Sequence, residues 1–361
     1  MEKDKSLSLK SLAIGSLPHE DVKKAMTLVE ENFSAIPFWP QLAKHNKNED
    51  MIIQFLEQIP GLVVSENKIY LDNETETFYE QLESLFLDYE EIFGANFGSN
   101  IDKYCISDNF SSTFGEFINI IKKYTPNFAK GQIVGPFTLS TTLVDKNGRL
   151  CFYDETLREV ITKHLTMKAL WQIKEIKKAN SETTPIIFID EPSISQLGTS
   201  AYLTISKNEV LSMLKEVSDK IKEAGAMSAI HCCGKSDWTI PIESGVDIIN
   251  FDGFLFAQNL SLFSKNIDEF IKTGGYIAWG MIPTLDKDAL EKIDLSELEN
   301  IFEKALKFLT DKGVDKNILL KQSLITPSCG AGSLSIELAE KAMNLTKDFS
   351  QKLNNIYKEI L

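Results

Sequence analysis

Histidine and cysteine lie close together in the second half of this 361-residue chain. His231 and Cys233 are separated by one residue at the end of an apolar run. On a β-strand, residues i and i+2 point to the same side, so both side chains would face one point while Cys232 faces the opposite side. Cys329 follows a later apolar run in the same way. We therefore predict that His231, Cys233 and Cys329 converge at one site.

A set of one imidazole and two thiolates favours zinc. Zinc prefers these ligands, and three protein ligands leave its fourth tetrahedral position for a substrate. The alternative interpretation is a buried histidine beside two inert core cysteines. The five cysteines of the chain are an odd number, which does not suggest a disulfide framework. Asp252 follows the next apolar run and is a candidate fourth ligand, a carboxylate that orients His231, or the cap of a helix.

Other polar residues follow apolar runs and suggest a substrate site. Asp190 and Glu191 are two adjacent carboxylates, which suit binding of an amino group or acid–base catalysis, or cap a helix. We predict both as substrate-binding and Asp190 also as catalytic. Ser16 follows a glycine, and its hydroxyl with nearby backbone amides suits a carboxylate. His19 is a candidate proton shuttle or a polar rim residue.

Eight short apolar runs alternate with segments of helical periodicity, and this alternation predicts the elements that position these residues. Strands that alternate with helices pair in parallel, and eight of them predict a closed (β/α)8 barrel, a TIM barrel. Barrel enzymes build their sites at the carboxyl ends of the strands, where all of the residues above fall. The runs cover residues 12–17, 37–42, 132–139, 185–190, 227–233, 246–251, 276–282 and 323–327.

The spacing between the second and third runs is much longer than elsewhere and predicts an insertion at approximately residues 44–128. It should contain a hairpin at residues 62–72 and helices near residues 78–93 and 112–123. No flexible linker flanks it, so we expect a single domain over residues 1–361. Much of the acidic charge lies in residues 66–91, which is typical of a solvated helical region and is alternatively a docking face.

Composition excludes several classes of function. The net charge of −14 argues against a nucleic-acid or anionic-membrane partner, since both need a basic face. No apolar stretch reaches the roughly 18–20 residues of a membrane span, and the N-terminus has no signal-peptide pattern, so we expect a cytoplasmic protein. The glycine-rich motifs of nucleotide-binding loops are absent from the sequence.

The order of these motifs resembles that of a known family. Gly-Ser-Leu-Pro-His at residues 15–19, Gly-Pro-Phe-Thr at 135–138, Asp-Glu-Pro at 190–192, His-Cys-Cys at 231–233 and Cys-Gly at 329–330 resemble the catalytic barrel of cobalamin-independent methionine synthase. They also resemble the wider superfamily of uroporphyrinogen decarboxylases and methylcobamide:thiol methyltransferases. The likeness extends from about Leu12 to Phe349.

The resemblance implies a role for several residues. His231, Cys233 and Cys329 match the zinc ligands, and Asp252 falls where methionine synthase has a glutamate ligand. By position, Asp190 would hold the amino group of homocysteine, and Ser16 would hold its carboxylate. The family's second carboxylate for the amino group falls near Ile53 or Gln54, which are not acids.

The resemblance implies zinc-dependent transfer of a methyl group to a small thiol, with homocysteine favoured. Folate-using methionine synthase has two barrels and this chain has one, which favours a methylated corrinoid (a methylcobamide) on a corrinoid protein as donor. The alternatives are methyltetrahydrofolate as donor, a metal-free enzyme like uroporphyrinogen decarboxylase, and a non-enzymatic protein that binds a corrinoid or tetrapyrrole.

Overall fold

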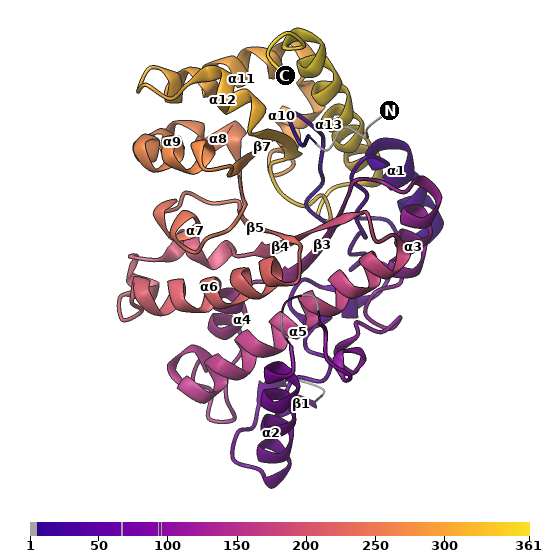
Figure 1. Cartoon of the computed structure of the whole chain (residues 1–361), viewed down its shortest axis with the longest axis vertical. Coiled ribbons are helices and arrows are strands. Elements are labelled where there is room, and N and C mark those ends of the chain that lie inside the picture. The colour runs from indigo at the N-terminus through magenta and orange to yellow at the C-terminus, as the bar shows by residue number, and fades with distance from the viewer. Residues whose placement is uncertain (1–5, 66–67, 93, 95) are drawn as a thin grey trace.

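A curled, six-stranded parallel sheet forms the centre of the molecule, with helices on its outer side (Figure 1). The computed structural model describes residues 6–65, 68–92, 94 and 96–361. The strand order follows the chain from β3 to β8, so each strand pairs with the next one in the sequence. The strands are β3 (Phe128–Val134), β4 (Thr184–Asp190), β5 (Met227–Cys232), β6 (Ile248–Phe251), β7 (Tyr276–Ile282) and β8 (Ser323–Pro327).

The outer helices begin at capping residues that the sequence supplies. Ser206 and Glu209 form a capping box at the start of α6, and Asp294 caps α11. In the described residues, no helix is long and apolar enough to cross a membrane. The helices outside the insertion are α1 (Val22–Phe33), α4 (Pro136–Thr142), α5 (Glu155–Ala179), α6 (Lys207–Glu223), α7 (Thr239–Glu243), α8 (Gly253–Leu260), α9 (Ser264–Lys272), α10 (Lys287–Lys292), α11 (Leu295–Thr310), α12 (Lys316–Lys321) and α13 (Ile336–Ile356).

The first two predicted strands are not regular strands in the structure. The first predicted strand, at residues 12–17, lies in an irregular segment at residues 11–17, and the second lies at 37–42. Isolated parallel bridges pair Ser11 with Ile325, Ser16 with Gln41, and Phe38 with Lys130. Residues 37 and 40 are prolines, which have no N–H group and interrupt a hydrogen-bonded ladder. The expected ring of eight strands is therefore six regular strands and two bridged segments.

The third predicted run is also only partly a strand. It was expected at residues 132–139, whereas β3 begins earlier and ends at Val134, and α4 begins at Pro136. Proline is favoured at the first position of a helix because its fixed backbone angle suits the helix and its missing N–H has no partner there. The glycine and proline that end this run therefore start a helix.

The inner face of the curled sheet changes from apolar to polar toward the carboxyl ends of the strands. Ten buried apolar residues, among them Phe188 and Ala229, form a cluster inside the curl. The next residues of the same strand parity are polar and buried. They are Lys130, Gln132, Asp190, His231, Asn250 and Thr326.

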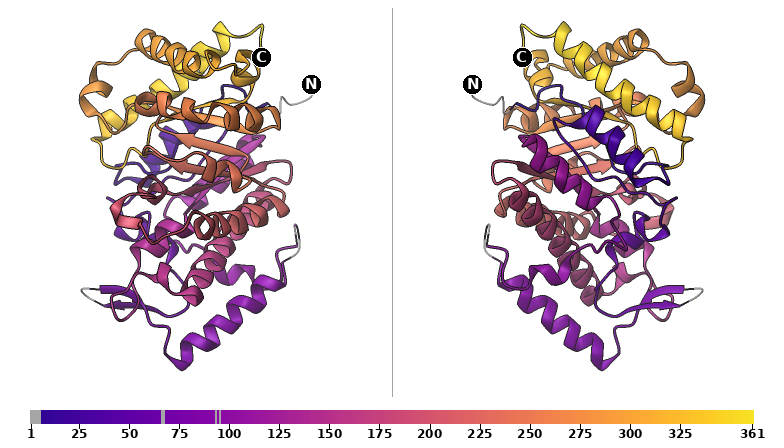
Figure 2. Two further views of the ribbon diagram at one scale, coloured as in Figure 1. Left: turned by 90° about the vertical axis from the view of Figure 1, so that its left-hand side faces the viewer. Right: turned by 90° about the vertical axis from the view of Figure 1, so that its right-hand side faces the viewer.

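The insertion after the second segment contains the expected hairpin and helices. β1 (Leu62–Ser65) pairs antiparallel with β2 (Lys68–Leu71), while the turn at residues 66–67 lies outside the described residues. α2 (Glu76–Glu90) and the hairpin project at one end of the molecule (Figure 2). α3 (Phe114–Tyr124) packs against α5. From α5, Lys168 donates to the Gln58 side chain and to the Cys105 carbonyl, both at 2.8 Å, and these bonds hold the insertion against α5.

Candidate metal centre

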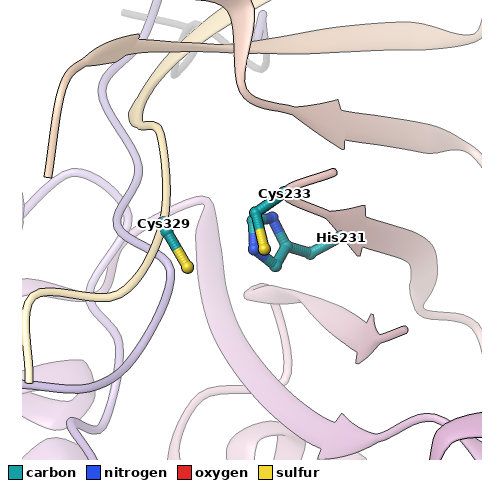
Figure 3. A group of neighbouring side chains, drawn as sticks. All are labelled: His231, Cys233 and Cys329. Atoms are coloured by element: carbon teal, nitrogen blue, oxygen red, sulfur yellow. The ribbon is translucent and has the colours of Figure 1, made fainter. Parts of the chain in front are cut away.

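Three side chains from two strand ends meet above the sheet. His231 is near the end of β5, Cys233 directly follows β5, and Cys329 lies in the loop after β8. One ligand atom from each lies within 4.8 Å of the other two. Figure 3 shows the Cys329 sulfur directed toward the other two side chains. The three residues predicted from strand parity and strand ends are thus neighbours in space.

The ring of His231 is fixed by Asn250 of β6. The Asn250 amide nitrogen donates to the Ala278 carbonyl at 2.8 Å and to the Thr326 hydroxyl at 2.9 Å. Its amide oxygen therefore faces His231 and accepts a hydrogen bond from Nδ1. The other ring nitrogen, Nε2, is buried without a hydrogen-bond partner. A zinc-binding histidine coordinates through one ring nitrogen while a neighbour holds the other, and Nε2 lies beside the two thiols in the place such a ligand needs.

The two thiols of this group are neighbours whose pKa values are shifted in opposite directions. Their interaction lowers the pKa of Cys329 and, together with burial, raises the pKa of Cys233. Two adjacent thiols of this kind are suited to bind a divalent cation, which stabilises both as thiolates. Cys232 points the other way and contacts the Ser236 hydroxyl at 2.9 Å, and burial raises its pKa to about 11.

A cavity of about 410 Å³ opens above the three ligands. A volume of this size holds a small thiol with space to spare. Its lining is largely apolar, with a few polar groups. Besides the three ligands it is lined by Ile14, Ser16, Leu17, Gln41, Ala43, Lys44, Glu49, Asp50, Met51, Asp190, Pro192, Leu285, Gly330, Gly332 and Ser333.

The two adjacent carboxylates of β4 have different surroundings. Asp190 lines the cavity, and its Oδ1 is buried without a hydrogen-bond partner. Burial raises the pKa of Asp190, and the nearby Lys130 and His231 act in the opposite direction. A buried carboxylate on the cavity lining that keeps one oxygen unpartnered is suited to a cationic ligand group.

The Glu191 carboxylate instead holds the first turn of α4. It accepts hydrogen bonds from the backbone amides of Phe137 and Thr138, both at 2.9 Å, and from the Thr138 hydroxyl at 2.6 Å. The carboxylate lies so close to Gly135 that a Cβ there would be 2.0 Å from its carboxyl carbon. Glu191 is not among the residues that line the cavity, so these contacts give no support to its predicted role in substrate binding.

The remaining predicted residues lie at different distances from the cavity. Ser16 lines it, and the Gly332 amide donates to its hydroxyl at 3.2 Å. His19 is buried outside the lining, with Nε2 3.5 Å from a Glu340 carboxylate oxygen. Asp252 caps α8 by accepting from the Leu255 amide at 2.9 Å, and it is not in the group of three ligands. The structure thus shows the capping role for Asp252, and Asn250 is the residue that orients His231.

Sequence reasoning missed several residues around the cavity. Asn250 was visible as a polar residue inside an apolar run, on the same side of the strand as Asp252. Neither Ile53 nor Gln54 lines the cavity, but Glu49 and Asp50 do. Both Glu49 carboxylate oxygens accept backbone amides, from Leu42 and Ser112, each at 2.9 Å. The exposed Asp50 therefore remains as a second acid at the mouth.

Comparisons with known proteins add little to this picture. No family model matches the chain, and no curated protein matches it. Among solved structures, one from Coccidioides immitis with a provisional assignment as fructose-1,6-bisphosphate aldolase shares 12% identity. The match covers 67% of this chain and 83% of the other, with a TM-score of 0.28. Similarity of this degree carries no conclusion about function, which has to be argued from the site.

Proposed function

We propose that this protein is a zinc-dependent enzyme that transfers a methyl group to a small thiol, with homocysteine favoured. The observation that carries the proposal is the convergence of His231, Cys233 and Cys329 within 4.8 Å at the floor of a cavity. The Nε2 atom of His231 is buried without a hydrogen-bond partner beside the two thiols, which fits a metal ion better than a packed core. The motif order that resembles methionine synthase agrees with this ligand set.

The ligand set suits zinc that has one position open to the cavity. Three protein ligands are typical of zinc sites that act on substrates, whereas structural sites have four. When bound, zinc would supply the charge that keeps a coordinated thiol deprotonated at neutral pH. We infer that the bridged segments at residues 11–17 and 37–42 replace the first two strands of a (β/α)8 barrel, which would place all three ligands at its carboxyl end.

The residues of the chain would bind and orient the acceptor. Asp190 offers an unpartnered carboxylate oxygen to an ammonium group. Ser16 lines the cavity and would donate its hydroxyl hydrogen to a carboxylate, while the Ala331 and Gly332 amides hold Ser16 in place. The apolar side chains of Leu17, Met51 and Leu285 would exclude water from the reacting sulfur. Such a pocket would hold an amino-acid thiol in one orientation.

The donor we propose is a methylated corrinoid carried by a partner protein. The cavity beside the six-stranded sheet has an open mouth, and the acidic insertion offers a surface to a docking protein. The alternative donor is methyltetrahydrofolate, a small molecule that this cavity would have to bind alone.

The proposal is tested by metal content and methyl transfer measured on the same preparation. We expect about one zinc per chain and formation of methionine from homocysteine and methylcobalamin. Zinc removal by a chelator should abolish turnover, and added zinc should restore it. A protein that binds no zinc and methylates none of a panel of small thiols would contradict the proposal and favour a metal-free enzyme of similar fold.

A further inference from the structure

Lys130 is a fully buried lysine in β3. It contacts both bridged segments, the first at residues 11–17 and the second at residues 37–42. Its backbone amide donates to the Pro37 carbonyl at 2.8 Å, in the second segment. Its ammonium group reaches the first segment, where it donates to the Ile14 carbonyl, and it also donates to the Gln132 side chain at 2.9 Å. Removing this ammonium would leave a buried carbonyl of the first segment without its partner.

The first segment in turn holds the loop that carries Cys329. Ser16 follows Ile14 by two residues, and its carbonyl accepts the Ala331 amide at 2.9 Å. The Ser16 hydroxyl accepts a hydrogen bond from the Gly332 amide at 3.2 Å. The Ser16 Oγ atom also lies so close to Gly330 that a Cβ added at Gly330 would be 2.1 Å from it. A continuous set of contacts therefore runs from Lys130 through residues 14–16 to the Cys329 loop.

The Cys329 loop is held from two sides. Thr284, which follows β7, bonds Cys329 itself: the Cys329 amide donates to the Thr284 hydroxyl at 3.0 Å, and this hydroxyl donates to the Cys329 carbonyl at 2.9 Å. The residues that follow Cys329 are held by Ser16 of the first segment, through the contacts given above. The position of the Cys329 loop thus depends on Thr284 on one side and on the first segment on the other.

We propose that Lys130 is a positioning residue for the metal centre, because it anchors residues 14–16 and so sets Cys329 against His231 and Cys233. The inference rests on the proposed metal site. Lys130 is not among the ligands or the residues that line the cavity, so its effect on the metal would be indirect.

If Lys130 acted on the metal centre through its charge alone, its removal would change the metal affinity in the opposite direction. Lys130 is a cation inside the sheet, and its removal would take positive charge away from a site that binds a cation. By Coulomb's law, that change alone would tighten metal binding. Loss of positioning would weaken binding and remove one sulfur from the ligand set. The direction of the change in metal affinity therefore separates the two roles.

The test compares Lys130→Met with Lys168→Met as a matched control. Lys168 is also fully buried, and its ammonium also donates to one backbone carbonyl and one glutamine side chain, but its contacts are with the insertion. Zinc affinity is measured by chelator competition, and the thiolate-to-cobalt charge-transfer band is recorded with Co²⁺ in place of zinc. Thermal unfolding is recorded for both variants to confirm that they fold.

We expect Lys130→Met to bind zinc about 10-fold or more weakly and to show a weaker thiolate band, whereas Lys168→Met keeps the wild-type values. Equal affinities and spectra for the two variants, or tighter binding by Lys130→Met, would overturn the inference. If Lys130→Met does not fold, Ser16→Ala breaks the next contact, and wild-type affinity and spectrum in that variant would overturn it. Wild-type protein that binds neither ion would overturn the proposed metal site itself.

Discussion

Strand parity at the end of β5 selects His231 and Cys233 over Cys232, and Cys329 comes from the loop after β8. Cys233→Ala and Cys329→Ala should each lose most of the bound zinc, because each removes one of three protein ligands. Cys232→Ala should keep it, since that thiol faces Ser236. Zinc per chain, measured by atomic emission on the three variants side by side, checks this. Equal loss of zinc from Cys232→Ala would show that strand parity selected the wrong cysteine.

Asn250 should matter almost as much as a ligand. Asn250→Ala removes the acceptor that fixes the His231 ring, so zinc affinity should fall by roughly 10–100-fold. Asn32→Ala is a suitable control, because Asn32 is another buried asparagine, bonded only within α1 in the described contacts. Chelator competition gives both affinities. A loss of the same size in the two variants would mean that Asn250 acts through general stability.

Asp190 is expected to bind the acceptor and not the metal. Asp190→Asn should weaken homocysteine binding by about 1–3 kcal/mol, the usual value of a charge-assisted hydrogen bond at a partly buried site. Its zinc content should stay at the wild-type level. Titration calorimetry with homocysteine and with the analogue that lacks the amino group isolates the contribution of the ammonium group. Unchanged affinity for homocysteine would exclude this contact.

The sequence predicts single residues well where strand parity alone decides. The pattern of His231 and Cys233, one residue apart at a strand end, was sufficient to place both on one side. The different surroundings of Asp190 and Glu191 could not be predicted, because they depend on the amides of α4, more than fifty positions earlier in the chain. The role of Asn250 depends likewise on its neighbours in β7 and β8.

At the scale of elements, Glu191 connects β4 to the start of α4. Burial raises the pKa of Glu191 to about 7 from its usual 4.5, although its hydrogen bonds act in the opposite direction. Between these values the folded protein holds a proton that the unfolded chain releases. The contribution of protonated Glu191 is therefore fully present below the unfolded pKa and is lost as pH rises through the folded pKa.

A comparison of the wild type with Glu191→Gln tests this titration. The free energy of unfolding of the wild type, relative to the variant, should decrease between about pH 5 and about pH 8. Urea unfolding at several pH values measures it, and zinc content should not depend on the substitution. A difference that is constant with pH would mean that the donors of α4 keep the carboxylate charged throughout.

Most of the expected elements are present, and the exceptions have local causes. β7 and β8 have the predicted bounds, because turn residues and polar segments mark both of their ends. The first two predicted strands could not be distinguished from irregular extended chain, because both give the same apolar pattern in the sequence. The prolines at 37 and 40 remove hydrogen bonds of the second strand but leave that pattern unchanged. The change from β3 to α4 was missed because the apolar residues continue across Gly135.

At the scale of the whole molecule, the insertion and the open mouth favour a donor that arrives on a protein. We expect methylcobalamin, free or protein-bound, to methylate the thiol and methyltetrahydrofolate to be inactive. With a protein-bound donor, the rate at low donor concentration should fall as ionic strength rises, because the acidic residues of α2 would attract the partner. Product formation with each donor alone, measured at increasing salt, decides this. Efficient turnover with methyltetrahydrofolate would contradict the expectation.

The central claim is that a zinc ion held by His231, Cys233 and Cys329 keeps one position for the sulfur of the acceptor. Zinc X-ray absorption, recorded on the purified protein before and after addition of the acceptor thiol, tests it most directly. The account predicts two sulfur neighbours from the protein and one more when homocysteine or another true acceptor is bound. A sulfur count that stays at two with every small thiol that the protein methylates would contradict it.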